Sequence, residues 1–222
     1  MKILLLSGGF VDEEFAAGFL KKHCFDKIIA VDGGLETAFR LAASPLTDIV
    51  GDFDTVEPEI LKLYREMPDG PVIHRFNPEK DYTDTDIALK LAIAKCRECP
   101  DTSQIWILGA TGTRLDHVLA NISMLLQPFK AGIPAYIQDK NNLIFLLSGS
   151  MAIDREGQFG HYLSLIPLTQ TLEGVTLEGV KYPLKDHRVY QGESLCVSNE
   201  ITGARAVLTV REGIAIVLET KD

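Results

Sequence analysis

The chain has 222 residues, of which 46% are hydrophobic and 24% are charged. This mixture is typical of a folded globular protein and excludes a disordered, collagenous or membrane-embedded chain. The 31 acidic and 22 basic side chains give a formal net charge of −9, so we expect no binding to nucleic acid or to anionic membranes. The first apolar run is too short for a signal peptide, which predicts a cytoplasmic protein.

The first two thirds of the chain alternate apolar runs rich in Ile, Val and Leu with segments of helical period. The runs predict strands of a parallel sheet that is buried on both faces. The predicted strands are Lys2–Leu6, Lys27–Val31, Asp48–Val50, Val72–Phe76, Ile105–Leu108 and Ala135–Gln138. The predicted helices are Asp12–Lys22, Leu35–Ala43, Glu57–Glu66, Asp84–Lys95 and Leu115–Leu126. The last helix has an apolar face, which we expect to pack on the sheet.

After Asp139 the pattern changes to short β-rich segments that are broken by Gly, Pro or charged residues. The predicted strands here are Leu143–Leu147, Tyr162–Ile166, Val175–Leu177, Ser194–Val197, Ala206–Val210 and Ile214–Leu218. We therefore predict an α/β domain over residues 1–139, with helices flanking a parallel sheet, followed by an all-β sandwich domain over residues 140–222.

Acidic and glycine-rich segments follow the predicted parallel strands. Because the carboxyl ends of such strands share one sheet edge, where these folds bind ligands, we expect the segments to meet there. Seven carboxylates belong to this set: Asp32, Asp52, Asp54, Asp81, Asp84, Asp86 and Asp116. They cannot all lie close together in ionised form without a cation, and oxygen ligands without a His or Cys cluster indicate Mg²⁺.

The same segments contain features that suit phosphate. Gly33-Gly34 and the loop from Gly109 to Gly112 each precede a predicted helix, so their backbone N–H groups can approach an anion. Lys80 and Arg114 add positive charge. A metal held by acids, together with two cations, is typical of phosphoryl transfer.

Each feature also has a purely structural interpretation. Thr83 and Asp84 can cap the helix that follows them, and Asp116 can complement a helix dipole. Gly33-Gly34 can form a simple turn between a strand and a helix. The convergence of all these residues on one edge favours the functional interpretation, in which His117 is a pocket residue without an assigned role as a base.

Four motifs, taken in order, resemble the thiamine pyrophosphokinase family: Val31–Gly34, Gly51–Thr55, Lys80–Asp86 and Gly109–His117. Ser198-Asn199-Glu200 is similar to that family's late Ser-Asn motif, and the resemblance covers nearly the whole chain. It implies a Rossmann-like ATP-binding domain, a β-sandwich domain, and a homodimer with thiamine between the acidic edge of one subunit and the sandwich of its partner.

The resemblance also assigns roles to residues. It implies that Mg²⁺ and the diphosphate are held by the catalytic set Asp52, Asp54, Asp81 and Asp84. Together with the loops described above, it predicts that ATP is held by Asp32, Gly33, Gly34, Lys80, Thr83, Thr111, Gly112, Arg114, Asp116 and His117. Ser198 and Asn199 would face thiamine from the other subunit.

Two departures from the family pattern stand out. Thr113 occupies a position before the Arg that is often Gly in similar enzymes, and a β-branched residue is awkward where φ must be positive. The single tryptophan, Trp106, falls in a predicted core strand, so the late stacking Trp of some relatives has no counterpart. Tyr190 or a residue of the partner chain remains as a substitute.

The implied reaction is an attack of the thiamine hydroxyl on the β-phosphorus of ATP, with AMP leaving and Asp81 or Asp52 accepting the proton. Three alternatives remain open. The first is a pyrophosphokinase for another hydroxymethyl heterocycle such as a pterin. The second is a phosphatase that uses Asp52 in Asp52-Phe53-Asp54-Thr55-Val56 as its nucleophile. The third is a nucleotide sensor without catalysis.

Overall fold

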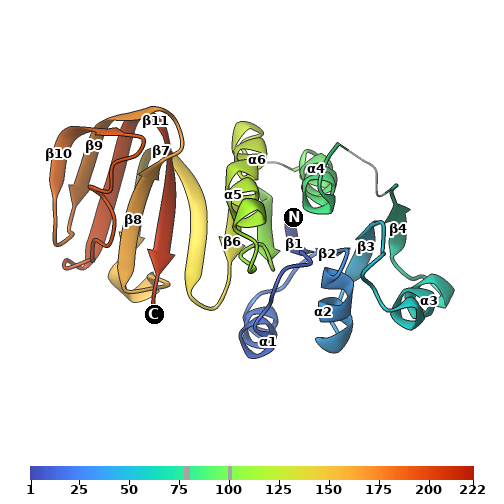
Figure 1. The fold of residues 1–222 in the computed structure, drawn as a ribbon. Coiled ribbons are helices and arrows are strands. Elements are labelled where there is room, and N and C mark those ends of the chain that lie inside the picture. Colours follow the sequence, from blue (N-terminus) through green and yellow to red (C-terminus); the bar gives the residue numbers. More distant parts are fainter. Residues whose placement is uncertain (78–80, 100–101) are drawn as a thin grey trace. The chain divides into compact units, whose positions relative to one another are not determined.

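The computed structural model describes residues 1–77, 81–99 and 102–222, so Lys80 lies outside the described residues. The chain separates into two units, Met1–Lys140 and Asn141–Asp222. The predicted fold class is confirmed, because a parallel sheet flanked by helices is followed by an antiparallel β unit (Figure 1).

Six parallel strands form the sheet of the first unit, in the order β6-β5-β1-β2-β3-β4. The strands are β1 (Lys2–Leu6), β2 (Lys27–Val31), β3 (Leu46–Gly51), β4 (Val72–Arg75), β5 (Gln104–Leu108) and β6 (Ala135–Gln138). The helices are α1 (Glu13–Lys22), α2 (Gly34–Arg40), α3 (Pro58–Glu66), α4 (Asp84–Cys96), α5 (Leu115–Met124) and α6 (Leu126–Lys130). Helices α1 to α3 cover one face of the sheet and α4 to α6 the other (Figure 1).

The core of this unit explains why the central strands are apolar on both faces. In β1 the residues Ile3 to Leu6 are all fully buried. Leu4 and Leu6 belong to a cluster with Phe19 of α1 and Leu35 of α2, while α4 contacts β1, β2 and β3 from the other side. Alternating side chains of one strand therefore enter two different helix layers.

The strand order creates a crevice at the carboxyl edge of the sheet. After β1 the chain builds β2, β3 and β4 on one side, and it then returns to place β5 on the other side of β1. The loop after β1 leads to α1 on one face of the sheet, and the loop after β5 leads to α5 on the other face. Because β1 and β5 are neighbours, the two loops separate and leave a crevice between them. Parallel α/β sheets bind their ligands at such a point.

The second unit is an antiparallel sheet in the order β10-β9-β11-β7, with β8 paired to β11. Its strands are β7 (Asn142–Asp154), β8 (Tyr162–Pro167), β9 (Thr171–Glu178), β10 (Leu184–Tyr190) and β11 (Arg205–Thr220). β11 is continuous, although the sequence predicts two separate strands. Its register against β7 shifts between Val210 and Ala215, where Gly213 has a φ of +99°. On its other side, the first half of β11 pairs with β9 and the second half with β8.

One strand prediction in this unit is wrong, and one strand is missed. Ser194–Val197 forms a turn, in which the Val197 N–H donates to the Ser194 carbonyl oxygen and only Cys196 is buried. β10 is not predicted, because only Val189 of its residues is buried and most of the others are polar or charged. Charged residues are common on an edge strand such as β10, and they hide the alternation that identifies a strand.

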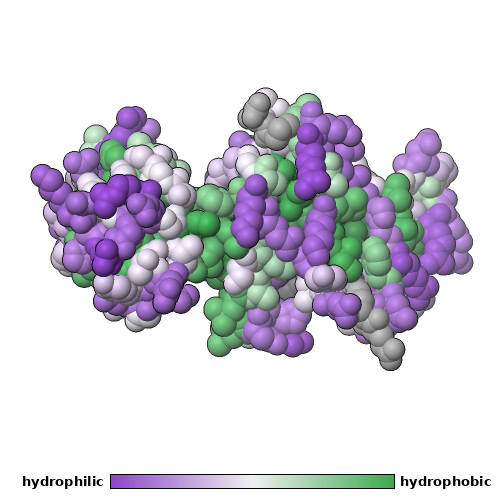
Figure 2. Space-filling view, turned by 90° about the horizontal axis from the view of Figure 1, so that it is seen from above, coloured by the Kyte–Doolittle hydropathy of each residue, from purple (hydrophilic) through white to green (hydrophobic). Residues whose placement is uncertain are grey.

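The expectation that the whole apolar face of Leu115–Leu126 packs on the sheet is also wrong. Leu125 is buried, but Leu115 and Leu119 are 74% and 66% exposed. Seen from the side of α4, α5 and α6, the first unit exposes hydrophobic residues between hydrophilic ones (Figure 2). Among the described residues, no helix combines the length and the apolarity needed to span a membrane.

Candidate active site

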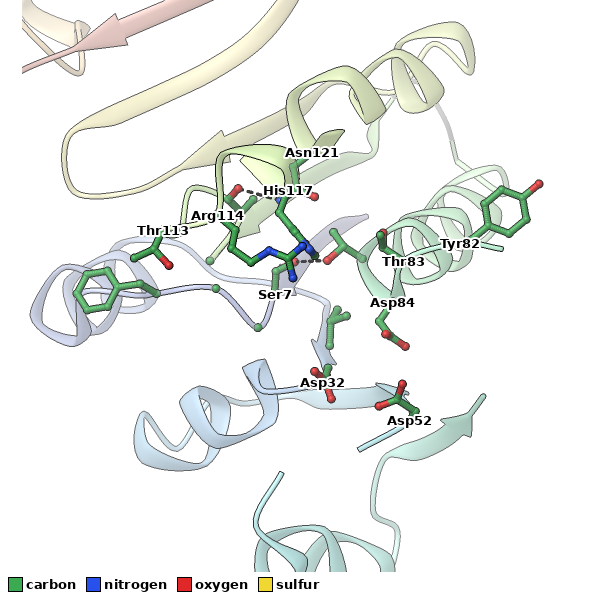
Figure 3. A pocket seen from close by; sticks show the side chains of 18 of the residues that line it. Ser7, Asp32, Asp52, Tyr82, Thr83, Asp84, Thr113, Arg114, His117 and Asn121 are labelled. Atoms are coloured by element: carbon green, nitrogen blue, oxygen red, sulfur yellow. Dashed lines mark hydrogen bonds between the residues drawn. The ribbon is translucent and has the colours of Figure 1, made fainter. Parts of the chain in front are cut away.

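A pocket of about 760 Å³ opens at the carboxyl edge of the parallel sheet. Its walls come from the loops after β1, β2, β3 and β5, from the start of α4 and from α5 (Figure 3). The predicted site residues that line it are Asp32, Asp52, Asp81, Thr83, Asp84, Gly112, Arg114 and His117. The pocket therefore lies at the point where the strand order reverses.

Three carboxylates of this edge form a tight group. Oxygen atoms of Asp32, Asp52 and Asp54 all lie within 4.8 Å of one another. The backbone around them is unusual, because Asp32 has a φ of +48° and Phe53 a φ of +66°. Non-glycine residues rarely adopt positive φ, and such residues often mark functional sites. The structure thus places Asp32 with the predicted metal ligands Asp52 and Asp54.

Asp32 has an uncompensated oxygen. Its Oδ2 accepts a hydrogen bond from Thr55 Oγ1 at 3.1 Å, but its Oδ1 is buried and has no hydrogen-bond partner. Burial raises the pKa of the Asp32 carboxyl, and the charges of Asp52 and Asp84 raise it further despite the bond from Thr55. A cation would satisfy the orphaned oxygen, so the group fits a metal ion bound by oxygen ligands.

The segment before α4 adds further acids. Asp81 and Asp84 line the pocket, and Asp84 points into the same region as Asp32 and Asp52 (Figure 3). Thr83 also lines the pocket and caps α4, since its hydroxyl accepts the Asp86 N–H at 3.2 Å. Both interpretations of Thr83 are therefore compatible with its position.

Asp86 does not join the acidic group, although the sequence includes it among the converging acids. Its side chain is buried, and it accepts hydrogen bonds from Lys90 Nζ at 3.0 Å and from Gln127 Nε2 at 2.6 Å. These partners compensate its charge within the protein. Asp86 therefore ties α4 to α6 and has no oxygen directed at the pocket group.

Arg114 and Asp116 form an exposed ion pair, with the Arg114 Nη2 atom 2.6 Å from Asp116 Oδ2. Hydrogen bonds from the Arg114 guanidinium lower the pKa of Asp116 to about 2. Arg114 lines the pocket, whereas Asp116 does not and holds the guanidinium from outside. His117 lines the pocket too, and its backbone N–H donates to Asp116 Oδ1. Asp116 therefore holds the Arg114 guanidinium in an orientation in which it can bind a phosphate in the pocket.

Other predicted residues lie behind the pocket wall. The Thr111 hydroxyl donates to Asp139 Oδ2 at 2.5 Å and is not part of the lining. Gly33 precedes α2, and a Cβ on Gly34 would collide with the Leu6 carbonyl oxygen, which gives Gly34 a packing role. Thr113 lines the pocket and is not among the described residues with positive φ, so its branched side chain causes no backbone strain.

Ser198 and Asn199 belong to the second unit. Ser198 is exposed and has a φ of +58°. Asn199 is only 4% exposed, and its side-chain amide bonds to the main chain of Tyr182. The two residues of this motif therefore have different environments.

Several lining residues are absent from the predicted set. Ser7 Oγ lies 3.1 Å from Thr85 Oγ1, which joins the loop after β1 to α4, and Phe10 is 72% exposed at the pocket. Their position after the first strand is a signal that could have found them. Asn121 donates to the Ala110 carbonyl oxygen at 2.8 Å and supports the loop after β5. It sits within a helix, where no sequence signal marks it.

Two family models match this chain. The model of the thiamin pyrophosphokinase catalytic domain matches residues 21–137, and that of the thiamin pyrophosphokinase vitamin B1 binding domain matches residues 150–215. The chain belongs to the thiamine pyrophosphokinase family. The pocket and the acidic group lie within or beside the segment matched by the catalytic model, and Tyr182, Ser198 and Asn199 lie within the second segment.

Individual members of the thiamine pyrophosphokinase family are similar over most of the chain. The Bacillus subtilis thiamine pyrophosphokinase is 34% identical over 87% of this chain and 87% of its own length. Its crystal structure matches with a TM-score of 0.86 and 28% identity over the full length of both chains. The thiamin pyrophosphokinase structure from Geobacillus thermodenitrificans has a TM-score of 0.82 and 31% identity, and covers 100% of this chain and 98% of the other.

Proposed function

We propose that this protein transfers the terminal diphosphate of ATP to the hydroxyl of thiamine, which forms thiamine diphosphate and AMP. The observation that carries the proposal is the acidic group, in which oxygens of Asp32, Asp52 and Asp54 lie within 4.8 Å of one another. The group lies where the strand order of the parallel sheet reverses, in a chain that belongs to the thiamine pyrophosphokinase family. Transfer of a highly charged diphosphate needs such a concentration of metal ligands, and a nucleotide sensor does not.

Mg²⁺ fits the acidic group because Asp32 Oδ1 is buried without a partner and all the ligands are carboxylate oxygens. Asp32, Asp52 and Asp54 would hold the ion, with Asp81 and Asp84 also available in the pocket. When bound, Mg²⁺ supplies positive charge to the diphosphate oxygens.

The chain's own groups would position the reactants. Arg114 would bind phosphate oxygens through its guanidinium, and Asp116 would keep that guanidinium in place. Backbone amides in Gly8-Gly9 and Gly112 line the pocket without side chains, which allows a phosphate to approach closely. An attack in line with the departing AMP requires this positioning more than it requires a strong base.

We further propose that the second unit binds thiamine and that the active form is a homodimer, with thiamine held between the pocket of one subunit and the second unit of the other. The vitamin B1 binding model supports the first part. Exposed apolar side chains at and near the pocket, Phe10, Leu115 and Leu119, support the second, because a monomer gains nothing by leaving them in water. We expect this enzyme to work in the cytoplasm.

Product analysis tests the reaction. Purified protein is incubated with ATP, Mg²⁺ and thiamine, and AMP, ADP and thiamine diphosphate are quantified with and without a chelator. We expect AMP and thiamine diphosphate in equal amounts, and neither after chelation. Formation of ADP would indicate transfer of a single phosphoryl group, and activity only with a hydroxymethylpterin would assign the pterin alternative. The oligomeric state is measured by light scattering.

A further inference from the structure

The loop before α4 folds back on the helix that it begins. Thr83 caps the helix, since its hydroxyl accepts the Asp86 N–H at 3.2 Å. Tyr82 precedes this cap, and the Nζ atom of Lys90, a residue of α4 itself, lies over the Tyr82 ring at 3.5 Å from the ring centre. A cation at this distance is attracted by the face of an aromatic ring. The Tyr82 ring is therefore bound to its own helix.

A buried acid holds Lys90 in this position. Asp86 is 6% exposed, and its Oδ2 accepts a hydrogen bond from Lys90 Nζ at 3.0 Å. Its Oδ1 accepts from Gln127 Nε2 of α6 at 2.6 Å, so a second helix fixes the carboxylate. A buried carboxylate with two charge-assisted or neutral donors has little freedom to move. The ammonium of Lys90 thus joins a fixed acid to the ring of Tyr82.

The Tyr82 ring does not face the acidic group of the pocket. It lies away from Asp32 and Asp52, whereas Asp84 points into their region (Figure 3). Tyr82 nevertheless lies between Asp81 and Asp84 in the sequence, and all three residues line the pocket. A fixed ring therefore fixes the main chain from which two pocket acids project.

The start of α4 is attached to the sheet as well. Ser7 Oγ lies 3.1 Å from Thr85 Oγ1, and Ser7 is 2% exposed directly after β1. This contact holds the first turn of the helix in place. The contact between Lys90 and Tyr82 extends the attachment to the residues before the helix, where Asp81 lies.

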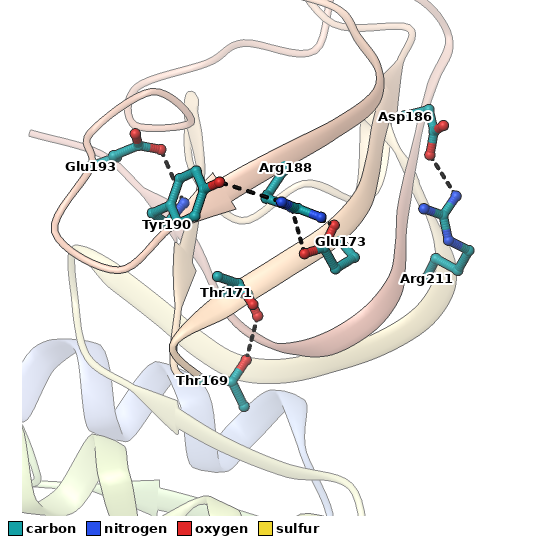
Figure 4. A network of polar contacts seen from close by, with 8 residues as sticks. All are labelled: Thr169, Thr171, Glu173, Asp186, Arg188, Tyr190, Glu193 and Arg211. Carbon is teal, nitrogen blue, oxygen red and sulfur yellow. Dashed lines mark hydrogen bonds and ion pairs between the residues drawn. The ribbon is translucent and has the colours of Figure 1, made fainter.

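Exposed ion pairs of the second unit are built differently. Arg211 and Asp186 pair through side chains that are 59% and 64% exposed (Figure 4). The Arg188 guanidinium reaches the Tyr190 hydroxyl at 3.5 Å, and so meets that ring at its edge (Figure 4). Exposed pairs of this kind contribute little to the position of a main chain. Lys90 differs from them because its acid is buried and because it covers the face of its ring.

We propose that Lys90 is a positioning residue of the active site, which together with Asp86 clamps Tyr82 against α4 and so keeps Asp81 and Asp84 at the pocket. This inference rests on the proposed function. A loose segment would have to become ordered each time Mg²⁺ and the diphosphate bind, and that loss of conformational entropy would weaken binding. The clamp, formed by Asp86, Lys90 and Tyr82, orders the segment before the ligands arrive.

The charge of Lys90 separates this role from a direct electrostatic one. A positive charge repels Mg²⁺, so its removal would, by electrostatics alone, favour Mg²⁺ binding. Loss of the clamp acts in the opposite direction, because the acids must then be ordered by the ion itself. The two explanations predict changes of opposite sign in the dissociation constant of Mg²⁺.

Titration of the substrate-free protein with Mg²⁺, followed by calorimetry, measures this sign. We expect Lys90→Ala to raise the dissociation constant about fivefold, as the loss of one cation–π contact predicts. Lys90→Arg keeps a cation for both the carboxylate and the ring and should stay within about twofold. Lys62→Ala is the matched control, because Lys62 forms an exposed pair with Glu66 at the same helical spacing, and it should leave the constant unchanged. Unaltered or tighter binding of Mg²⁺ by Lys90→Ala would overturn the proposal.

A double-mutant cycle tests whether Lys90 acts through Tyr82. Tyr82→Leu removes the aromatic ring and should weaken Mg²⁺ binding as much as Lys90→Ala does, while Tyr82→Phe keeps the ring and should not. The variant with both Lys90→Ala and Tyr82→Leu should be no worse than either single variant. Additive losses would show that the two side chains act independently and would refute the clamp.

Thermal unfolding without Mg²⁺ checks that each variant folds, and Tyr82→Leu, at an exposed position, tests the clamp even if Lys90→Ala does not fold. A lowered unfolding temperature together with unaltered Mg²⁺ binding would show a purely structural role and would overturn the proposal. Absence of Mg²⁺ binding by the unaltered protein would overturn it too. The proposed function fails separately, if the unaltered protein binds Mg²⁺ but makes no thiamine diphosphate.

Discussion

Strand β3 and the loop that follows it carry acids in opposite electrostatic environments. Within the strand, Asp48 is 1% exposed and accepts bonds from Thr47 Oγ1 at 2.7 Å, from His74 Nε2 at 2.9 Å and from Lys95 Nζ at 3.2 Å. Just beyond the end of the strand, Asp52 and Asp54 meet Asp32, and no ion pair of these three is present among the described residues. A fold compensates the acids it uses for stability. It leaves uncompensated those that receive an external cation.

The largest expected effect is on catalysis, from Asp54→Asn. Loss of one metal ligand should lower kcat/KM about a thousandfold, or ~4 kcal/mol of transition-state stabilisation, with little change in stability. Coupled detection of AMP measures the rate. Asp69→Asn removes the same charge from an exposed position in the same unit and should leave the rate unchanged. Full activity of Asp54→Asn would remove this residue from the mechanism.

Asp48→Asn should lower the stability of the fold and leave the catalytic rate unchanged. The substitution removes the charge that Lys95 and His74 pair with, which should cost about 1–3 kcal/mol of unfolding free energy. Urea denaturation measures this, and activity per folded molecule should be retained. Asp154→Asn breaks an exposed pair with Arg205 and should have little effect. An equal loss in both variants would contradict the contrast between the two environments.

The pH dependence of stability should also identify Asp48. Burial alone would raise its pKa, but the hydrogen bonds from His74, Thr47 and Lys95 outweigh burial and lower it. A carboxyl with a lowered pKa in the folded state stabilises the protein above its unfolded pKa of about 3.9, and this stabilisation is lost as the pH falls through the folded value. The stability difference between the unaltered protein and Asp48→Asn should therefore be constant above about pH 5 and shrink below about pH 4. A difference that persists to lower pH would contradict the role of the charge.

The smallest expected effect has the opposite sign. Asp32→Asn should stabilise the metal-free protein by about 1 kcal/mol or less, because it removes a half-buried charge, one oxygen of which has no partner, beside two other carboxylates. Asn also tolerates the positive φ of this position. Thermal unfolding with increasing Mg²⁺ provides the second measurement. The unaltered protein should gain stability with Mg²⁺ and Asp32→Asn should not, whereas an equal gain would exclude Asp32 as a ligand.

The same contrast explains which parts of the site can be predicted from sequence. Asp32, Asp52, Asp81 and Asp84 follow predicted strands or begin a helix, and the rule that parallel strands end at one edge brings them together. Asp86 follows the same pattern, but its side chain turns toward Lys90 and Gln127. Sequence position fixes the edge to which a residue belongs, while the neighbouring side chains decide which way it points.

The antiparallel unit shows a similar division. The two halves of β11 can be identified from sequence because their residues alternate between core and surface, and β8 can be identified because it is a short apolar run. β10 and the turn at Ser194–Val197 cannot, because one is polar at a sheet edge and the other is apolar without being paired in a strand. A local sequence pattern indicates which residues are buried. Burial does not identify an edge strand, which can be mostly exposed, or a turn, which can contain apolar residues.

The sequence by itself determined the order of strands and helices in the first unit, the edge at which its acids gather and the family to which the motifs belong. These features depend on hydrophobic period and on short motifs, which are local properties of the chain. Only the tertiary structure decided that Asp32, Asp52 and Asp54 come within 4.8 Å of one another, that Asp86 is neutralised, and that Asn199 supports Tyr182. Each of these facts depends on atoms from segments far apart in the chain, whose contacts arise only when the fold brings them together.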